Sequence, residues 1–191
     1  MTTIASNLQA ARAAIAAAAA GAGRAADDIA LLAVSKTFAP DAIREAYRAG
    51  QLRFAESYVR EAMEKRAALH GLPIEWHYIG PIQSNKTRAI AENFAWVHSV
   101  DRPKIAERLS AQRPAHLPPL QVCLQVNTSG EASKSGVSPD EVLGLAHAIA
   151  LLPNLKLRGL MAVPAPCDDV ATQRLRFAQL RELRDQINRQ G

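Results

Sequence analysis

The chain has 191 residues, 48% of them hydrophobic, which is enough for one well-buried domain and too short for a second full one. The net charge of +5 is modest, because 23 Lys and Arg are interleaved with 18 Asp and Glu, and aromatic residues make up only 5%. These values argue against a nucleic-acid-binding protein, since no basic run is interleaved with aromatics, and they fit a mild preference for anionic small molecules.

The first predicted element is an alanine-rich helix near the N-terminus. Residues 10–23 resemble a signal peptide at first sight, but alanine is a good helix former and a poor membrane anchor. Ile4, Leu8 and Ile15 are the better apolar anchors of a soluble amphipathic helix. No run of about 18 strongly apolar residues occurs in the sequence, so we expect no transmembrane span.

Beyond this helix, segments of strand length alternate with segments of helical spacing. The expected strands cover residues 29–35, 51–55, 74–80, 95–100, 119–127 and 155–163. The expected helices cover residues 40–50, 58–69, 84–94, 101–112 with Asp101 as N-cap, a segment opening at 138–141, and a long Arg-rich segment from about 170. Strict alternation of this kind predicts an α/β fold with parallel strands and right-handed crossovers.

Two architectures compete for these six βα units. The count favours an open doubly wound sheet, because a TIM-type (β/α)₈ barrel needs eight units and roughly 250 residues. The polar residues favour the barrel, because nearly every strand ends in a polar or reactive side chain, whereas an open sheet gathers such groups at one switch point. We therefore expect a (β/α)₈ barrel, with residues 1–191 as a single domain that carries about six of the eight units.

Lys36 stands where the first buried strand ends. Such a lysine points into a partly desolvated mouth, where loss of hydration disfavours the ammonium and makes the amine a nucleophile for carbonyl compounds. Pyridoxal 5′-phosphate (PLP), an aldehyde, is the most common ligand of this kind. From this segment alone, a lysine that extends its ammonium into water is the more ordinary explanation.

Two loops carry further candidates. His77 lies in the third strand pattern, and a Gly-Pro break then precedes a run of side-chain donors that includes Asn85; a satisfied core histidine and a helix cap are the ordinary alternatives. The long loop from Asn127 to the fifth helix contains Lys134, which is either a second amine near the ligand or a solvated surface lysine. The histidines show no metal-ligand spacing, and the two cysteines form neither a disulfide framework nor a CxxC pair, which predicts a reducing, cytoplasmic location.

Six segments occur together and in one order: VSKT (34–37), FAESYVRE (54–61), WHYIGPIQSNK (76–86), HSVDR (98–102), QVNTSGEASKSG (125–136) and LRGLMAVPAP (157–166). Over nearly the whole chain they resemble the pyridoxal phosphate homeostasis protein family. The resemblance implies an alanine-racemase-like (β/α)₈ barrel that binds PLP as a Schiff base with Lys36 and buffers or delivers the cofactor without catalysis. The further residues expected to line the cofactor ring each end or follow a strand on the same rim: Ser57, His77, Asn85, Asn127 and Met161.

The resemblance also implies partners. PLP is the small-molecule ligand, PLP-dependent apo-enzymes are candidate recipients, and the full-length form is expected to be a monomer. An amino-acid racemase or decarboxylase of the same barrel superfamily is the enzymatic alternative; it needs a second acid or base on the opposite face of the cofactor, usually from a separate C-terminal domain. A chain that binds no ligand and acts only through its exposed edges is the structural alternative.

Two departures from the family pattern are visible. Ser57 replaces an asparagine in the family's Phe-Gly-Glu-Asn-Tyr motif, so one contact to the cofactor ring is lost or bridged by water. The chain stops at Gly191, before the motifs that form strands seven and eight and the phosphate cup, so we expect a C-terminally truncated barrel that holds PLP weakly. Open strand edges and a bare apolar wall then predict instability or self-association.

Overall fold

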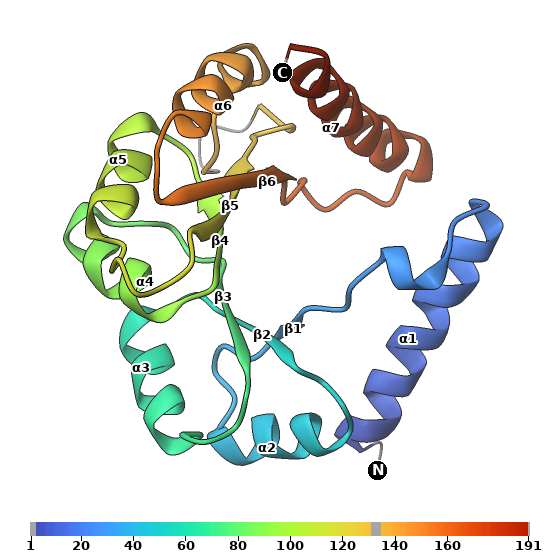
Figure 1. Cartoon of the computed structure of the whole chain (residues 1–191). Helices are drawn as coiled ribbons and strands as arrows, with labels where there is room; N and C mark the ends of the chain where they lie inside the picture. The colour runs from blue at the N-terminus through green and yellow to red at the C-terminus, as the bar shows by residue number, and fades with distance from the viewer. Residues whose placement is uncertain (1–2, 131–134, 191) are drawn as a thin grey trace. The chain divides into compact units, whose positions relative to one another are not determined.

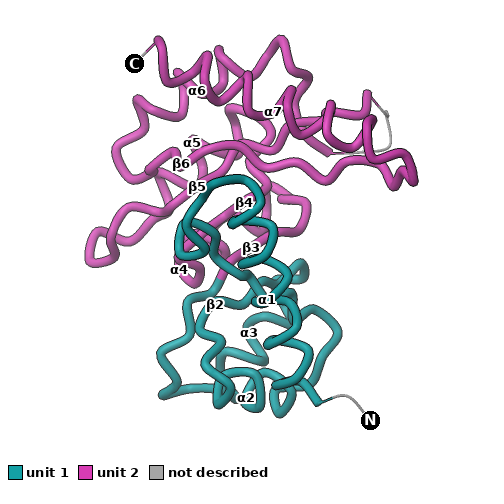
Figure 2. The backbone as a smooth tube through the Cα atoms, turned by 90° about the vertical axis from the view of Figure 1, so that its right-hand side faces the viewer, with its two compact units in different colours: residues 1–76 teal, residues 77–191 magenta. Residues whose placement is uncertain are grey.

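The computed structural model of the chain describes residues 3–130 and 135–190. The chain divides into two compact units, Met1–Trp76 and His77–Gly191 (Figure 2). Lys134 lies outside the described residues, so its expected role near the ligand stays a prediction.

The first unit pairs two parallel strands with three helices. Its elements are α1 (Ile4–Gly21), the 3₁₀ turn η1 (Ala26–Asp28), β1 (Ala33–Val34), α2 (Pro40–Arg48), β2 (Arg53–Glu56), α3 (Val59–Ala68) and the start of β3 (Glu75–Tyr78). Ala33 of β1 pairs with Phe54 of β2, and the backbone N–H of Glu75 donates to the carbonyl of Leu52 at 2.9 Å. Strand β2 therefore has β1 on one side and the beginning of β3 on the other.

Local sequence signals explain the helix boundaries of this unit. A capping box formed by Thr3 and Ser6 begins α1, as the reciprocal side-chain to backbone hydrogen bonds satisfy N–H groups that have no partner inside the helix. Pro40 occupies the first turn of α2, and Gly50, with a φ of 82°, follows its end. Phe54 and Ala55 of β2 are fully buried and belong to the hydrophobic core.

Among the residues that the structure describes, the second unit contains four parallel strands, from the end of β3 onward. Its elements are η2 (Ser84–Lys86), α4 (Thr87–Asn93), β4 (Trp96–Val100), α5 (Pro103–Gln112), β5 (Leu120–Gln125), η3 (Pro139–Glu141), α6 (Val142–Ala150), β6 (Leu155–Met161) and α7 (Val170–Gln190). Strand β4 pairs with β3 and β5, and β5 pairs with β6. Figure 1 shows α4, α5 and α6 on one side of these strands.

Strand neighbours thus follow the order of the sequence within each unit. A doubly wound sheet reverses its strand order at a switch point, and the observed pairings contain no such reversal among the described strands. The structure therefore favours the barrel type of connection over the open sheet. The described residues contain six strands, as the alternating pattern predicts.

Two expectations about element ends are wrong. Strand β1 is only Ala33–Val34 rather than residues 29–35, and Val34 remains 47% exposed. Asp101 does not cap α5, which begins at Pro103 with Arg102 as the N-cap residue and no side-chain cap hydrogen bond. Asp101 instead pairs with the adjacent Arg102 at 2.7 Å, while burial raises the pKa of its carboxyl.

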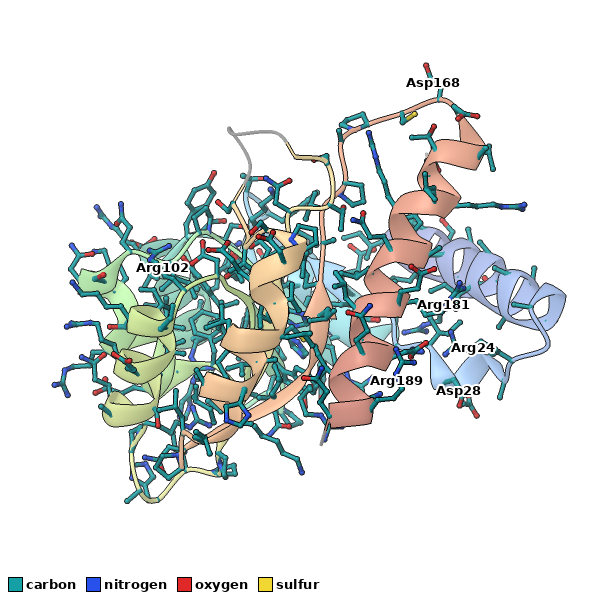
Figure 3. All side chains as sticks on the ribbon, turned by 90° about the horizontal axis from the view of Figure 1, so that it is seen from above. Arg24, Asp28, Arg102, Asp168, Arg181 and Arg189 are labelled. Carbon is teal, nitrogen blue, oxygen red and sulfur yellow. The ribbon has the colours of Figure 1, made fainter. Side chains whose placement is uncertain are left out.

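The last helix, α7, matches the long Arg-rich segment expected from about residue 170. Asp169 caps it, because its carboxylate accepts hydrogen bonds from the backbone N–H groups of Ala171 at 3.2 Å and Thr172 at 2.9 Å. Figure 3 shows Arg181 and Arg189 along this helix and Asp168 just before it. Across the described ranges 3–130 and 135–190, no helix is long and apolar enough to cross a membrane.

Candidate functional site

Lys36 lies in a tight turn directly after β1. The backbone N–H of Phe38 donates to the carbonyl of Ser35 at 3.1 Å, so residues 35–38 form a β-turn with Lys36 in its second position and Thr37 in its third. The Lys36 side chain is exposed, so the expectation of a partly desolvated lysine is wrong for this structure. The physical reason is that β1 is short and itself half open to solvent at Val34.

Thr37 adopts an uncommon backbone conformation. Its φ is 69°, in the left-handed region where a β-branched residue is a genuine outlier. It is the one non-glycine residue with positive φ among those described. Such strain persists only where surrounding contacts over-determine the geometry, and it gathers at functional sites. The conformation of Thr37 therefore marks the turn that carries Lys36.

A buried ion-pair cluster lies beneath this turn. Lys65 is 4% exposed, and its ammonium donates to the Ser35 carbonyl at 2.6 Å, to Glu56 Oε1 at 2.8 Å and to Glu61 Oε1 at 2.6 Å. The Ser35 hydroxyl also donates to Glu56 Oε1, at 2.6 Å. An ammonium has three donors, so Lys65 is fully hydrogen-bonded within this cluster.

Glu61 extends the cluster to the other side of Lys36. Its Oε1 accepts the backbone N–H of Thr37 at 2.5 Å. The hydrogen bond from Lys65 lowers the pKa of the Glu61 carboxyl, with a smaller contribution from Thr37, against the opposing effect of burial. The peptide groups before and after Lys36 are thus both tied to one ammonium–carboxylate cluster.

The three charged residues of this cluster, Glu56, Glu61 and Lys65, were not among the expected site residues. Glu61 and Lys65 stand four residues apart on a predicted helix, a spacing that brings side chains together on one face. That signal was available in the sequence. The burial of Lys65 and Glu56, at 4% and 0% exposure, was not.

Ser57 follows β2 at the position equivalent to that of Lys36 after β1. Val34 and Ala55 are paired in the parallel register, and Lys36 and Ser57 each stand two residues further on. Ser57 is half-buried. The first unit therefore brings these two expected site residues to the ends of neighbouring strands.

His77 belongs to an aromatic cluster inside the second unit. It is 5% exposed, and its Nδ1 lies 2.8 Å from Nε2 of His98 on β4. Both imidazole rings stack on the ring of Trp96, with centroid distances of 5.6 Å for His77 and 5.7 Å for His98. The guanidinium of Arg158, a residue of β6, lies 5.8 Å from the Trp96 centroid. This environment fits a core histidine, the ordinary alternative offered by the sequence, and the expected contact of His77 with the cofactor ring stays a prediction.

The histidine pair makes stability dependent on pH. Burial, and secondarily the charge of His77, lowers the pKa of His98 from 6.5 to about 4. The folded state therefore favours neutral His98. The contribution of neutral His98 to the free energy of unfolding is fully present above about pH 6.5 and is lost as the pH falls toward about 4. Urea unfolding across this range is expected to show a smaller acid destabilisation in His98→Gln than in the unaltered protein. His116→Gln, at an exposed histidine, is the control, and an equal pH dependence in all three proteins would contradict the assignment.

Asn127 and Met161 lie together at the ends of β5 and β6. The backbone N–H of Val126 donates to the carbonyl of Met161 at 2.8 Å. The Asn127 side-chain oxygen accepts the backbone N–H of Gly130 at 3.1 Å, which shapes the loop after β5. Asn85 is exposed in η2, after β3. These placements leave the expected contacts of Asn85, Asn127 and Met161 with the cofactor ring as predictions.

Comparison with known proteins places the chain in a family. The model of the alanine racemase N-terminal domain matches residues 4–191. A pyridoxal phosphate homeostasis protein of Pseudomonas aeruginosa is 59% identical over 188 residues, which cover 98% of this chain and 82% of that protein.

The chain belongs to the pyridoxal phosphate homeostasis protein family.

Two solved structures are similar to this chain. A protein from Bifidobacterium adolescentis has a TM-score of 0.91 and 33% identity, covering 98% of this chain and 80% of that one. PipY of Synechococcus elongatus, in a structure with PLP bound, has a TM-score of 0.77 and 38% identity, covering 85% of this chain and 76% of that one. The expected fold class, the alanine-racemase kind of α/β barrel, is thereby confirmed at the level of the family.

Proposed function

We propose that this chain binds PLP through Lys36 and acts in intracellular PLP homeostasis, buffering or delivering the cofactor without catalysing a reaction. The observation that carries the proposal is the exposed primary amine of Lys36 on a strained turn fixed from beneath by Lys65 and Glu61. PLP supplies an aldehyde, which condenses reversibly with a primary amine. The binding of PLP by the related PipY supports the same ligand.

The groups around Lys36 fit such a ligand. The amine is accessible, and the Ser57 hydroxyl stands at the matching position of the neighbouring strand. Lys65 does not compete for the aldehyde, because its three donors are engaged with Ser35, Glu56 and Glu61. His77, Asn85, Asn127 and Met161 remain the proposed contacts of the ring from the later strands.

A carrier role is favoured over a racemase or decarboxylase. Both carboxylates next to the Lys36 turn, Glu56 and Glu61, accept hydrogen bonds from Lys65 and are committed to holding the turn. In this proposal neither serves as an acid or base toward a substrate. PLP-loaded protein is accordingly expected to exchange the α-hydrogen of L-alanine no faster than free PLP does.

The cellular location, the domain organisation and the recipient proteins are part of the same proposal. Cys123 and Cys167 are free thiols, which supports the cytoplasmic location expected from the sequence. Residues 1–191 act as one PLP-binding barrel domain, and PLP-dependent apo-enzymes receive the cofactor. Exchange of labelled PLP from the loaded chain to an apo-enzyme tests the delivery step.

Replacing Lys36 with alanine tests the covalent site. The unaltered chain is incubated with PLP, reduced with borohydride and digested, and mass spectrometry is expected to find the pyridoxyl label at Lys36. Lys36→Ala is expected to lose this label and also the change in absorbance that follows addition of PLP before reduction. Lys104→Ala, at an exposed lysine of α5, is expected to retain both. Equal labelling in Lys36→Ala and the unaltered chain would remove Lys36 from the site.

A further inference from the structure

We propose that Glu61, held in place by Lys65, is a positioning residue that sets the direction of the Lys36 side chain for reaction with an aldehyde. The inference rests on the proposed binding of PLP through Lys36. It concerns residues of the first unit alone, and it assigns a role to a carboxylate that the sequence left without one.

The geometry of the turn is the first support. In a β-turn the N–H of the third residue has no partner within the turn, and here that residue is Thr37. A positive φ at this position is suited to glycine or asparagine, whereas Thr37 is β-branched. The turn therefore needs an external partner to remain in this conformation. Glu61 Oε1 supplies it by accepting the Thr37 N–H at 2.5 Å.

The fixed position of Glu61 is the second support. A half-exposed glutamate on a helix normally moves freely, but here its Oε1 also accepts from Lys65 at 2.6 Å. Lys65 is itself anchored by the Ser35 carbonyl and by buried Glu56. The chain of contacts therefore runs from the peptide group before Lys36 to the one after it, through one ammonium and one carboxylate.

These contacts fix the backbone from which the flexible Lys36 side chain extends. With the carbonyl of Ser35 and the N–H of Thr37 both held, the Cα–Cβ bond of Lys36 has a defined direction although the amine stays exposed. Orientation of a reacting group contributes strongly to rate, and small misplacements are costly. Releasing the Thr37 N–H is expected to slow reaction at Lys36 by about 10-fold.

Three variants of α3 distinguish loss of the Glu61 hydrogen bond from loss of its charge and from a general effect of changing a glutamate on this helix. Glu61→Ala removes the acceptor, Glu61→Gln keeps an acceptor oxygen without the charge, and Glu64→Ala changes an exposed glutamate that pairs only with Arg60 at the surface among the described contacts. All three retain the buried pair of Lys65 and Glu56. Amide hydrogen exchange at Thr37 in cofactor-free protein is one readout, and the rate of borohydride-trapped PLP labelling at Lys36 is the other.

Glu61→Ala is expected to raise exchange at Thr37 and to slow labelling about 10-fold, with Glu61→Gln recovering most of both and Glu64→Ala matching the unaltered chain. An unchanged Thr37 exchange or an unchanged labelling rate in Glu61→Ala overturns the positioning role. So does a Glu61→Gln variant as slow as Glu61→Ala, because charge rather than the hydrogen bond would then control the rate. Absence of label at Lys36 in the unaltered chain refutes the proposed function itself.

Discussion

Lys65→Met is expected to lower the free energy of unfolding by about 3–5 kcal/mol, the usual effect of breaking a buried ion pair from one side. The Lys65 and Glu56 side chains are 5% and 0% exposed, so removal of the ammonium leaves the Glu56 charge without compensation. The second carboxylate oxygen of Glu56 is already buried without a hydrogen-bond partner in the described chain, so the Ser35 hydroxyl is the one donor left to the group among the described contacts. Urea unfolding monitored by circular dichroism measures the loss.

Two further variants identify the cause of that loss. Lys65→Met combined with Glu56→Gln removes both charges and is expected to recover a large part of the stability, because a neutral amide is far less costly to bury than an unpaired carboxylate. Lys104→Met changes an exposed lysine and is expected to stay within about 0.5 kcal/mol of the unaltered chain. A double variant no more stable than Lys65→Met would show that packing, rather than the ion pair, is responsible.

Gly136→Ala is expected to detach the segment that packs against the end of β5. Gly136 has a φ of 122°, and a Cβ there would lie 2.7 Å from the backbone N of Asn127 and 2.9 Å from the carbonyl C of Val126. Both atoms belong to backbone, so the contact cannot be relieved by a side-chain rotation. The strained φ alone costs about 1–3 kcal/mol, and the clash adds to it.

The hydrogen bonds around Gly136 provide the measurement. Val137 donates to the Gln125 carbonyl and accepts from the Asn127 N–H, both at 2.9 Å, and amide exchange at these two N–H groups should rise in Gly136→Ala. PLP affinity should fall with them, because Asn127 is a proposed ring contact. Gly130→Ala is the matched control: its φ is 68° but nothing lies within 4 Å of its Cβ position. Equal destabilisation by the two substitutions would exclude the clash as the cause.

Much of the fold was predictable because it rests on short-range signals. Pro40 in the first turn of α2, Gly50 after its end and the capping box of Ser138 and Glu141 mark boundaries that neighbouring residues decide. Apolar runs with polar ends predicted the strands, because parallel strands are buried on both faces. Where the prediction failed, as at Asp101, the deciding contact was to Arg102 rather than to a helix N–H group.

The candidate site likewise has features that the sequence could predict and features that it could not. Lys36 could be found from its place after an apolar run and from the motifs around it, and Ser57 from the equivalent place after the next strand. The exposure of Lys36 could not be found, because it depends on how short β1 is. His77 could be placed on a strand, but its partnership with His98 and Trp96 depends on the register of β3 and β4.

The sequence by itself determined the family, the alternation of strands and helices, and the lysine that is proposed to bind PLP. Ordered motifs and local residue spacing are properties of the sequence and can be recognised without a structure. Only the tertiary structure decided what holds that lysine. Ser35 follows β1, Glu56 ends β2 and Lys65 lies on α3. They meet because the parallel pairing of β1 with β2 brings the two strand ends close to α3. Burial then makes each of their contacts strong, since water cannot replace an ion-pair partner that is removed.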